Sequence, residues 1–386
     1  MTESRSVQDM AYPTDEVVIV TVRAVAMRAP IETHVRTSFG IMRDRPAVFV
    51  EVEDDRGHRG LGEIWCNFPS VGAEHRAHLV LETAGPLLCD LSPLPVGDVF
   101  AVLMTKLHVL AIQSGEWGPL RQVCAGLDIA CHDLAARRTG LPLHAYLGGQ
   151  ASGSVAAYAS GIGPEAPAAV AARERARGHE SFKLKVGFGV EIDTRSLDAI
   201  RGAISERRLM IDANQGWTLE QAIEQGNRFA QYRIDWLEEP LRADRPVEEW
   251  RALSEAMPIA IAAGENMNEV AEFQAATGSG IVRFLQPDAA KWGGISGCLA
   301  VARAARAAGL VYCPHYLGGG IGLLASAHLL AAAGGEGMLE IDTNPNPLRE
   351  KLVADLMPLS EGRVTLSQRP GLGIADDLES VGARAM

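Results

Sequence analysis

The most regular feature of the chain is an alternation of short apolar runs with longer amphipathic stretches, from about residue 155 to about residue 345. The apolar runs have the length of strands, and the stretches between them repeat apolar positions at helical spacing. Strands alternating with helices form parallel sheets, and eight of them favour a closed (β/α) barrel over an open sheet. The expected strands are 155–161, 181–187, 208–214, 234–239, 258–265, 281–288, 310–315 and 338–342.

The first 150 residues have a different pattern, which predicts an α+β domain. Alternating apolar positions predict strands at 17–27 and 47–54, and the polar stretch 31–46 between them is expected to be a loop. Helical patterns follow at about 71–88, 96–111 and 122–138. We therefore divide the chain into four parts: a disordered tail (1–15), an N-terminal α+β domain (16–150), the barrel (151–345) and a C-terminal segment that returns to the first domain (346–386).

Composition narrows the class of protein. A net charge of −12 without any basic run argues against a nucleic-acid partner. The six cysteines form no C-x-x-C pair, which fits free thiols in a reducing compartment. The first fifteen residues are polar, and we find no apolar run near the roughly 20 residues of a membrane span. These features predict a cytoplasmic enzyme with no membrane partner.

Three of the apolar runs end in an acidic residue at almost equal steps: Asp212, Glu238 and Glu265. Each step has about the length of one strand, its loop and a crossover helix, so the acids should lie at the same end of successive parallel strands. Three converging carboxylates repel one another unless a cation lies among them, and an all-oxygen site suits Mg²⁺. The spacing therefore predicts a Mg²⁺ site.

Two lysines in the strand at 181–187 point to an anion. Alternation turns Phe182 and Leu184 towards the helices and Lys183 and Lys185 into the barrel. Lysine is almost never fully buried without a partner, and the acidic cluster or a substrate carboxylate would be that partner. Beside a dication their pKa is expected to fall, which would make one lysine a base. The alternative is an edge strand with solvated lysines.

The regular spacing continues to three further strand ends, at Asp288, His315 and Glu340. His315 is expected across the barrel mouth from Lys185, with Asp288 accepting its ring N–H so that the imidazole can act as a base. Glu340 is expected to stay protonated and to donate a hydrogen bond to a developing enolate. The alternative for Glu340 is a salt-bridged acid at a strand end.

Other residues near the mouth give expectations about the substrate. Asn214 shares the inward face with Asp212 and is expected to bind a substrate hydroxyl. Thr37 and Ser38 in the lid suit a polar substrate, whereas Trp65 suits an apolar one.

Two features near these residues are assigned to structure, and the role of a third is left open. Glu239 should point away from the metal ligands. For the glycine run at 318–322, a tight turn is favoured over a phosphate site at a helix start. Lys291 is expected either to pair with the acidic ligands or to be an ordinary surface lysine.

Taken together, these motifs resemble the enolase superfamily, in its mandelate racemase subgroup. The resemblance begins near residue 17 and covers nearly the whole chain. It rests on 125–130, 143–149, 183–185, 212–214, 236–240, 264–266, 287–291, His315 and Glu340. It implies a capping α+β domain on a modified (β/α)₇β barrel, and a homo-oligomer, often an octamer. The chain departs from the family pattern at the glycine run, which leaves the substrate open.

The resemblance also implies roles for the residues singled out above. Mg²⁺ would bind Asp212, Glu238 and Glu265. Lys185 would be one base and the His315–Asp288 pair the other, while Lys183 would neutralise a substrate carboxylate and Glu340 would stabilise the enolate.

The expected reaction is removal of the proton next to a carboxylate in a small molecule. Dehydration of an acid sugar is ranked first, and racemisation or epimerisation of an α-hydroxy or related acid is the alternative. A hydrolase or an aldolase would need histidine ligands or a lone Schiff-base lysine. A non-catalytic relative would usually lack some of the seven strand-end residues, which are Lys185, Asp212, Glu238, Glu265, Asp288, His315 and Glu340.

Overall fold

The computed structural model describes residues 15–36, 40–69, 71–149, 152–374 and 377–385. Its centre is the predicted barrel, in which each strand pairs in parallel with the next from the first to the seventh, and the eighth pairs with the first. The α/β fold class predicted from the sequence is confirmed. The strands are β6 (Ser154–Ile162), β7 (Ser181–Lys185), β8 (Arg208–Asp212), β9 (Ile234–Glu238), β10 (Ile261–Ala263), β11 (Val282–Leu285), β12 (Val311–Tyr312) and β13 (Met338–Asp342).

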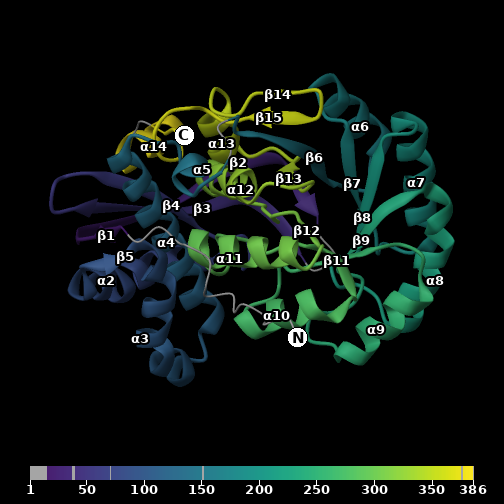
Figure 1. Ribbon diagram of the computed structural model, residues 1–386. Coiled ribbons are helices and arrows are strands. Elements are labelled where there is room, and N and C mark those ends of the chain that lie inside the picture. The colour runs from purple at the N-terminus through teal and green to yellow at the C-terminus, as the bar shows by residue number, and fades with distance from the viewer. Residues whose placement is uncertain (1–14, 37–39, 70, 150–151, 375–376, 386) are drawn as a thin grey trace.

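Helices on the outside of the barrel connect these strands (Figure 1). Helix α8 begins at a capping box: the Thr218 side chain accepts from the Gln221 N–H, and the Gln221 side chain accepts from the Thr218 N–H. The barrel helices are α6 (Pro167–Ala176), α7 (Val190–Ile204), α8 (Leu219–Phe229), a 3₁₀ turn (Ala230–Tyr232), α9 (Val247–Ala256), α10 (Val270–Ser279), α11 (Gly294–Ala307) and α12 (Gly320–Ala333).

The barrel strands have two different faces. Phe182 and Leu184 are buried in the layer between strands and helices, while Lys183 is fully buried inside the barrel. The alternation predicted for β7 is therefore confirmed, and β7 is an interior strand with a partner on each side. Below Lys183 the interior is filled by an apolar layer of Tyr158, Met210, Trp236, Ala262, Phe284, Cys313 and Met338. The carboxyl end of the barrel is left to charged residues.

The N-terminal domain packs a three-stranded antiparallel sheet against a helical layer, with α4 lying directly on the sheet. Gly62 permits this contact, since a Cβ at that position would clash with the backbone oxygen of Gly126 in α4. The elements are β1 (Glu16–Val17), β2 (Ile19–Arg36), β3 (Ile41–Asp54), β4 (Arg59–Ile64), α1 (Gly72–Leu79), a π-helical turn (Val80–Ala84), α2 (Gly85–Leu91), β5 (Leu94–Pro95), a 3₁₀ turn (Val96–Asp98), α3 (Val99–Ser114), α4 (Trp117–Thr139) and α5 (Leu143–Tyr146).

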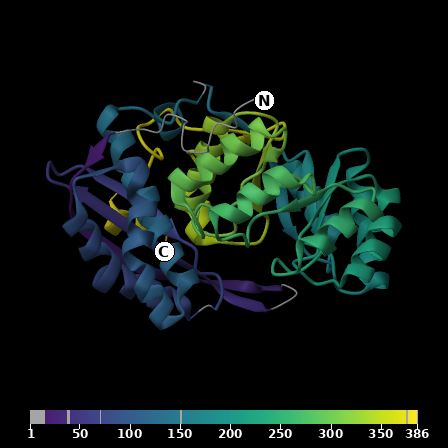
Figure 2. The ribbon, with the colours of Figure 1, turned by 60° about the horizontal axis from the view of Figure 1, so that its bottom comes forward.

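The prediction of a loop at 31–46 is wrong. Both β2 and β3 extend into this stretch as a two-stranded ribbon, in which Val35 pairs with Met42, and both side chains are buried. Cross-strand hydrogen bonding and contact with the rest of the protein outweigh the polar composition on which the expectation rested. Figure 2 shows the ribbon projecting from the N-terminal domain towards the barrel.

The C-terminal part contacts both domains. It consists of α13 (Pro347–Val353), β14 (Leu359–Ser360), β15 (Arg363–Thr365) and α14 (Leu378–Ala385), and β15 pairs antiparallel with β6. The Leu372 N–H donates to Asp133 of α4 over 2.7 Å, and the Leu378 N–H donates to Glu51 of β3 over 2.9 Å.

Among the described residues one segment, Val96–Ser114, is long and apolar enough to cross a membrane, with a mean hydropathy of 1.4. The expectation that no apolar run approaches this length is therefore wrong. The inner face of the segment, including Leu103 and Leu107, is buried in the core of the N-terminal domain, as in a core helix of a globular domain.

Candidate active site

The residues singled out by spacing meet at the carboxyl end of the barrel. Lys185, Asp212 and Glu238 are consecutive partners in the strand register, so their Cα atoms lie side by side across three strands. Glu265, Asp288 and His315 follow β10, β11 and β12, and Glu340 lies within β13. Equal steps along the sequence thus correspond to one edge of the barrel, where (β/α) barrels carry their chemistry.

Lys183 lies at the centre of the charged layer. Its Nζ is 2.6 Å from Glu238 Oε1 and 2.7 Å from Glu340 Oε1, and it lies 5.4 Å from the centre of the Tyr158 ring. Burial alone would lower the pKa of this lysine, but Glu238 and Glu340 raise it well above its ordinary value. A fully buried ammonium group is stable here because two carboxylates contact it.

Lys185 forms an ion pair with Asp212 at the next strand end. Asp212 also accepts the Asn214 N–H over 2.7 Å, and Asn214 adopts a left-handed backbone with φ of 42°. The pKa of Lys185 is raised, because the attraction of Asp212 outweighs burial. The fall in lysine pKa predicted from the sequence depends on a cation lying beside the lysines. Here the neighbouring groups are carboxylates, and the pKa of Lys185 rises instead.

His315 and Asp288 form the predicted pair, with Nδ1 of the imidazole 2.8 Å from Asp288 Oδ2. The other ring nitrogen, Nε2, is 2.5 Å from Glu265 Oε2 and 3.9 Å from Glu340 Oε2. Burial opposes the charged form, but Glu265, Glu340 and Asp288 together raise the pKa of His315 well above its usual range. The imidazolium form is therefore favoured in this arrangement.

Glu340 does not show the protonated state expected from the sequence. Burial would raise its pKa, but Lys183 and His315 lower it, so the carboxylate is ionised. It accepts hydrogen bonds from the Ser160 hydroxyl over 2.5 Å and from the Tyr316 N–H over 3.1 Å. The sequence could not give this result, because the sign of the shift depends on which cations reach the carboxyl group.

The charge balance of the site tests whether a metal ion fits. Its acids outnumber Lys183, Lys185, Lys291 and His315. Burial, together with the neighbouring Asp212 and Glu340, raises the pKa of Glu238 to about 7 against the pull of Lys183. The acids are Asp212, Glu238, Glu239, Glu265, Asp288 and Glu340. A surplus of buried carboxylate at adjoining strand ends is a donor set that suits a hard divalent cation.

In the present arrangement the three predicted ligands are paired with protein cations. Glu238 contacts Lys183, Asp212 contacts Lys185, and Glu265 contacts His315. Consistent with this pairing, the described part of the chain contains no group of three or more acidic, histidine or cysteine side chains in metal-binding geometry.

Glu239, assigned to structure from the sequence, is buried beside the acidic cluster. Its backbone has φ of 37°, and its side chain accepts a 2.7 Å hydrogen bond from Asn266. Asn266 in turn accepts a 2.9 Å hydrogen bond from Lys291 Nζ, which lies 5.0 Å from the centre of the Trp65 ring. The alternation of side chains along β9 correctly predicts that Glu239 points away from Glu238. The positive φ of Glu239 directs its side chain towards Glu265, and this direction cannot be predicted from alternation.

The lid residues divide into two groups. Thr37 and Ser38 lie outside the described residues. Trp65 follows β4 and is half-buried, and its N–H donates to the Ala290 oxygen over 3.1 Å, so it lies against the loop that follows Asp288. Asn67 donates to the Leu317 oxygen in the loop that follows His315. No sequence pattern signals this contact, because it joins positions 250 apart in the chain.

The glycine run at 318–322 forms the start of α12, and a protein carboxylate caps it. The N–H groups of Gly319 and Gly322 donate to Glu63 over 2.5 and 2.9 Å. The glycine run is therefore the N-terminus of a helix as well as the tight turn favoured from the sequence. The carboxylate of Glu63, in the N-terminal domain, takes the place that a bound anion would have there.

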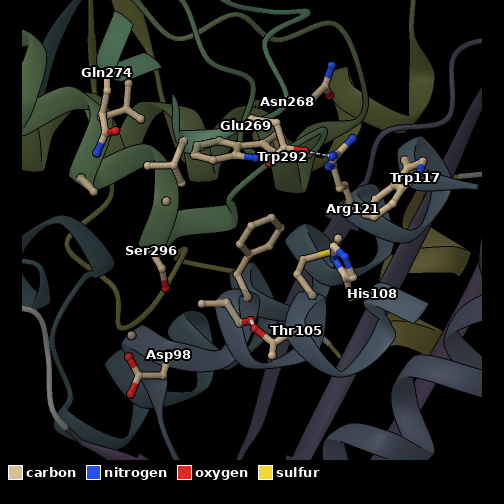
Figure 3. A pocket seen from close by; sticks show the side chains of 18 residues that line it. Asp98, Thr105, His108, Trp117, Arg121, Asn268, Glu269, Gln274, Trp292 and Ser296 are labelled. Carbon is tan, nitrogen blue, oxygen red and sulfur yellow. Dashed lines mark hydrogen bonds and ion pairs between the residues drawn. The ribbon is translucent and has the colours of Figure 1, made fainter. Parts of the chain in front are cut away.

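A cavity of about 1080 Å³ lies elsewhere, on the outside of the barrel between α3 and the helices α10 and α11 (Figure 3). Its walls are mainly apolar, with Phe100, Met104 and Trp292, and an Arg121–Glu269 ion pair crosses one end. None of the charged residues at the barrel mouth lines it.

The barrel, the domain beside its mouth and the lysine, carboxylate and histidine series define a class: enzymes of the enolase type. The N-terminal domain matches the mandelate racemase / muconate lactonizing enzyme N-terminal domain over residues 17–148, and the barrel matches the enolase C-terminal domain-like family over 166–380. The chain belongs to this family, as the resemblance implied. The N-terminal domain is therefore its capping domain.

Named relatives support an enzyme. D-galactarolactone cycloisomerase of Agrobacterium fabrum is 34% identical over 86% of this chain and 89% of that protein. A mandelate racemase/muconate lactonizing enzyme structure from Bordetella bronchiseptica has a TM-score of 0.89 at 50% identity, covering 96% of this chain and all of that one. An L-talarate/galactarate dehydratase with bound Mg and L-glucarate has a TM-score of 0.80 at 26% identity, covering 99% and 95%. More distant relatives include an epimerase and a racemase.

Proposed function

We propose that this protein is a Mg²⁺-dependent enzyme that removes the proton next to a carboxylate, and that it dehydrates an acid sugar. The observation that carries the proposal is the placement of two proton-transfer groups around one carboxylate cluster. Lys185 pairs with Asp212, and His315 pairs with Asp288 and Glu265. The strands before these groups, β7 and β12, lie three positions apart around the eight-stranded barrel, so the groups face the mouth from different sides.

Asp212, Glu238 and Glu265 are proposed to hold the metal ion, since their oxygens suit Mg²⁺ and the site carries surplus negative charge. Bound there, Mg²⁺ supplies Lewis-acid stabilisation to the carboxylate of the substrate as negative charge develops on it. Lys183 is proposed to add positive charge beside the same group. Glu340, 2.7 Å from Lys183, fixes the position of its ammonium group and borders the developing enolate.

The proton transfers follow from the same residues. Lys185 carries an ammonium group beside Asp212; once this group has lost a proton to solvent, the amine takes the α-proton from one side, and the C–H electron pair passes into the enolate. In dehydration the enolate then expels the β-hydroxyl, and the imidazolium of His315 donates the proton with which that group leaves as water. Asp288 holds the Nδ1 side of the ring, so that Nε2 faces the substrate.

The second candidate is racemisation or epimerisation. It is favoured by the same pair of groups on two sides of the mouth, because the proton can return from the side opposite its removal. It is also favoured by Trp65, whose ring presents an apolar surface beside Lys291.

A substrate panel with Mg²⁺ tests the proposal. We would use galactarate, L-talarate, L-glucarate, arabinonate, D-galactarolactone, mandelate and hydrophobic dipeptides, and score 2-keto acid formation and deuterium wash-in at the α-carbon. Product identifies dehydration, and wash-in without product identifies racemisation or epimerisation. Lys185→Ala and His315→Asn should each abolish wash-in on one face; unchanged wash-in in both would refute the two-base assignment.

Other outcomes separate the remaining classes. Inactivation by borohydride with a keto acid would indicate a Schiff-base enzyme, and neither product nor wash-in across the panel would favour a non-catalytic relative.

Substrate contacts by Thr37, Ser38 and Asn214 stay predictions, as do the domain limits and cytoplasmic location. A homo-oligomer, with an octamer as the expected size, is tested by light scattering.

A further inference from the structure

Alternate residues at the end of β4 reach from the capping domain to the two loops that carry the His315–Asp288 pair. The Glu63 side chain contacts the loop after His315, the Trp65 backbone contacts the loop after Asp288, and the Asn67 side chain contacts the first loop again. One short segment of the capping domain therefore contacts both loops that follow the members of this pair.

Glu63 makes the most extensive of these contacts. It is 2% exposed and accepts hydrogen bonds from the N–H groups of Gly319 and Gly322, at the first turn of α12. A carboxylate at this place satisfies backbone donors that the helix itself leaves open and is stabilised by the helix dipole. The Tyr316 hydroxyl lies against the same carboxylate, without the alignment of a good hydrogen bond.

The glycine run is what lets Glu63 approach so closely. A Cβ at Gly319 would lie 2.7 Å from Glu63 Oε1, and a Cβ at Gly322 would clash with the Tyr316 hydroxyl. Neither glycine has a φ in the left-handed region, so room for Glu63 and Tyr316, rather than backbone freedom, explains them. The glycine run at 318–322 thus makes room for the side chain of Glu63, which lies more than 250 positions earlier in the chain.

The contact continues into the catalytic layer through Tyr316, the residue after His315. The Tyr316 N–H donates to Glu340 Oε2 over 3.1 Å, and His315 Nδ1 bonds Asp288 over 2.8 Å. The loop between β12 and α12 is therefore held by Glu63 at its helical end and by Glu340 and Asp288 at its catalytic end. A shift of the helical end moves the backbone that carries the imidazole.

We propose that Glu63 is a positioning residue for His315: by capping α12 it fixes the loop that places the imidazole for proton transfer. The inference rests on the proposed function of His315 as one of two opposed proton-transfer groups. It predicts that loss of Glu63 slows proton exchange only on the face of the substrate that His315 serves. The reason is that Glu63 contacts the loop after β12 and makes no described contact with β7, which bears Lys185. General loss of stability would affect both faces of the substrate alike.

The test compares Glu63→Gln with Glu51→Gln. Both glutamates lie in the capping sheet, both are 2% exposed, and Glu51 also accepts a backbone N–H at a helix start, that of Leu378 in α14. The control thus matches burial, helix capping and the loss of a carboxyl group, without contact to the catalytic loops; Glu51 differs in pairing with Arg23 over 3.0 Å. Asn67→Ala is a second variant, which removes the neighbouring contact to Leu317 without changing a charge.

Two measurements are made on the full-length protein with Mg²⁺. Deuterium wash-in is followed from galactarate and from L-talarate, which differ in configuration at an α-carbon, and His315→Asn identifies the face that His315 serves. If another compound in the panel is the substrate, its two epimers or enantiomers replace this pair. Amide hydrogen exchange of the peptide spanning residues 316–323 reports on the cap without any substrate.

Glu63→Gln should slow wash-in on the His315 face by about 10- to 100-fold, the size of effect that an ångström-scale misplacement produces. Wash-in on the Lys185 face should change by less than about threefold, and the peptide at 316–323 should exchange faster. Asn67→Ala should act in the same direction with smaller size, and Glu51→Gln should leave all three unchanged.

Equal losses on both faces, or the same losses in Glu51→Gln, would overturn the inference. If the wild-type protein shows no wash-in with any compound, the proposed function fails. Amide exchange then decides the capping role alone: unchanged exchange in Glu63→Gln would overturn that as well, and faster exchange would support it.

Discussion

Replacing Asp342 by asparagine should destabilise the protein far more than removing either single arginine that binds it. Asp342 lies at the end of β13, where Oδ2 is 2.7 Å from Arg45 Nη2 and 3.1 Å from Arg349 Nη1. Arg45 belongs to β3 of the capping domain, and all three side chains are buried. This acid therefore joins the capping domain to the barrel and neutralises two guanidinium groups.

The structure sets the size of the effect. Burial opposes the charge of Asp342, but Arg45 and Arg349 hold its pKa at about 2, below the ordinary value of 3.8. That difference corresponds to about 2 kcal/mol of stability at neutral pH. Asp342→Asn also leaves two buried guanidinium groups without a counter-charge, which brings the expected loss to about 3–5 kcal/mol.

Arg45→Met should cost less, about 1–2 kcal/mol, because Asp342 keeps Arg349 as its partner. It also removes Nε and Nη1 of Arg45, which are buried without a hydrogen-bond partner among the described residues. The two costs differ because different groups are left unpaired. Loss of Asp342 leaves two buried guanidinium groups without a counter-charge, whereas loss of Arg45 leaves Asp342 paired with Arg349.

Urea unfolding at pH 7 and fixed protein concentration measures these differences for the wild type, both variants and the double variant. The acid side gives a second check. Because the pKa of Asp342 is lowered, its contribution is complete above about pH 4 and is lost as the pH falls towards 2, so Asp342→Asn should flatten that part of the profile. The reasoning is refuted if Arg45→Met costs more than Asp342→Asn, or if Asp342→Asn costs under 1 kcal/mol.

Three further predictions use other parts of the molecule. Glu265→Gln should weaken Mg²⁺ binding about tenfold or more in calorimetry, with the fold unchanged by circular dichroism; equal affinity would remove Glu265 from the metal site. Burial lowers the pKa of His179 to about 4, so about 3 kcal/mol of stability should be lost between pH 6.5 and 4, and His179→Gln should flatten that slope; an unchanged slope would assign the loss to another group. Gly322→Ala should cost about 1–3 kcal/mol in urea unfolding because its Cβ clashes with the Tyr316 hydroxyl, and a neutral result would show that the tyrosine can move aside.

The sequence alone determined the barrel and the positions of the site residues. Each strand, loop and helix uses a similar number of residues, so acids at equal steps fall at the same strand ends; Asp212 and Glu238 are direct register partners. Alternation correctly turned Lys183 into the barrel, since side-chain direction in a strand depends only on local geometry. Both inferences succeed because they need nothing beyond the repeat length and the strand period.

Tertiary structure decided what these residues touch. The ionised state of Glu340 depends on Lys183 and His315, and the direction of Glu239 depends on a backbone turn after β9. The carboxylate of Glu63 at α12 and the contact between Arg45 and Asp342 join residues more than 250 positions apart. No periodic pattern carries such contacts, because they arise only when the capping domain packs on the barrel and desolvates charges from both.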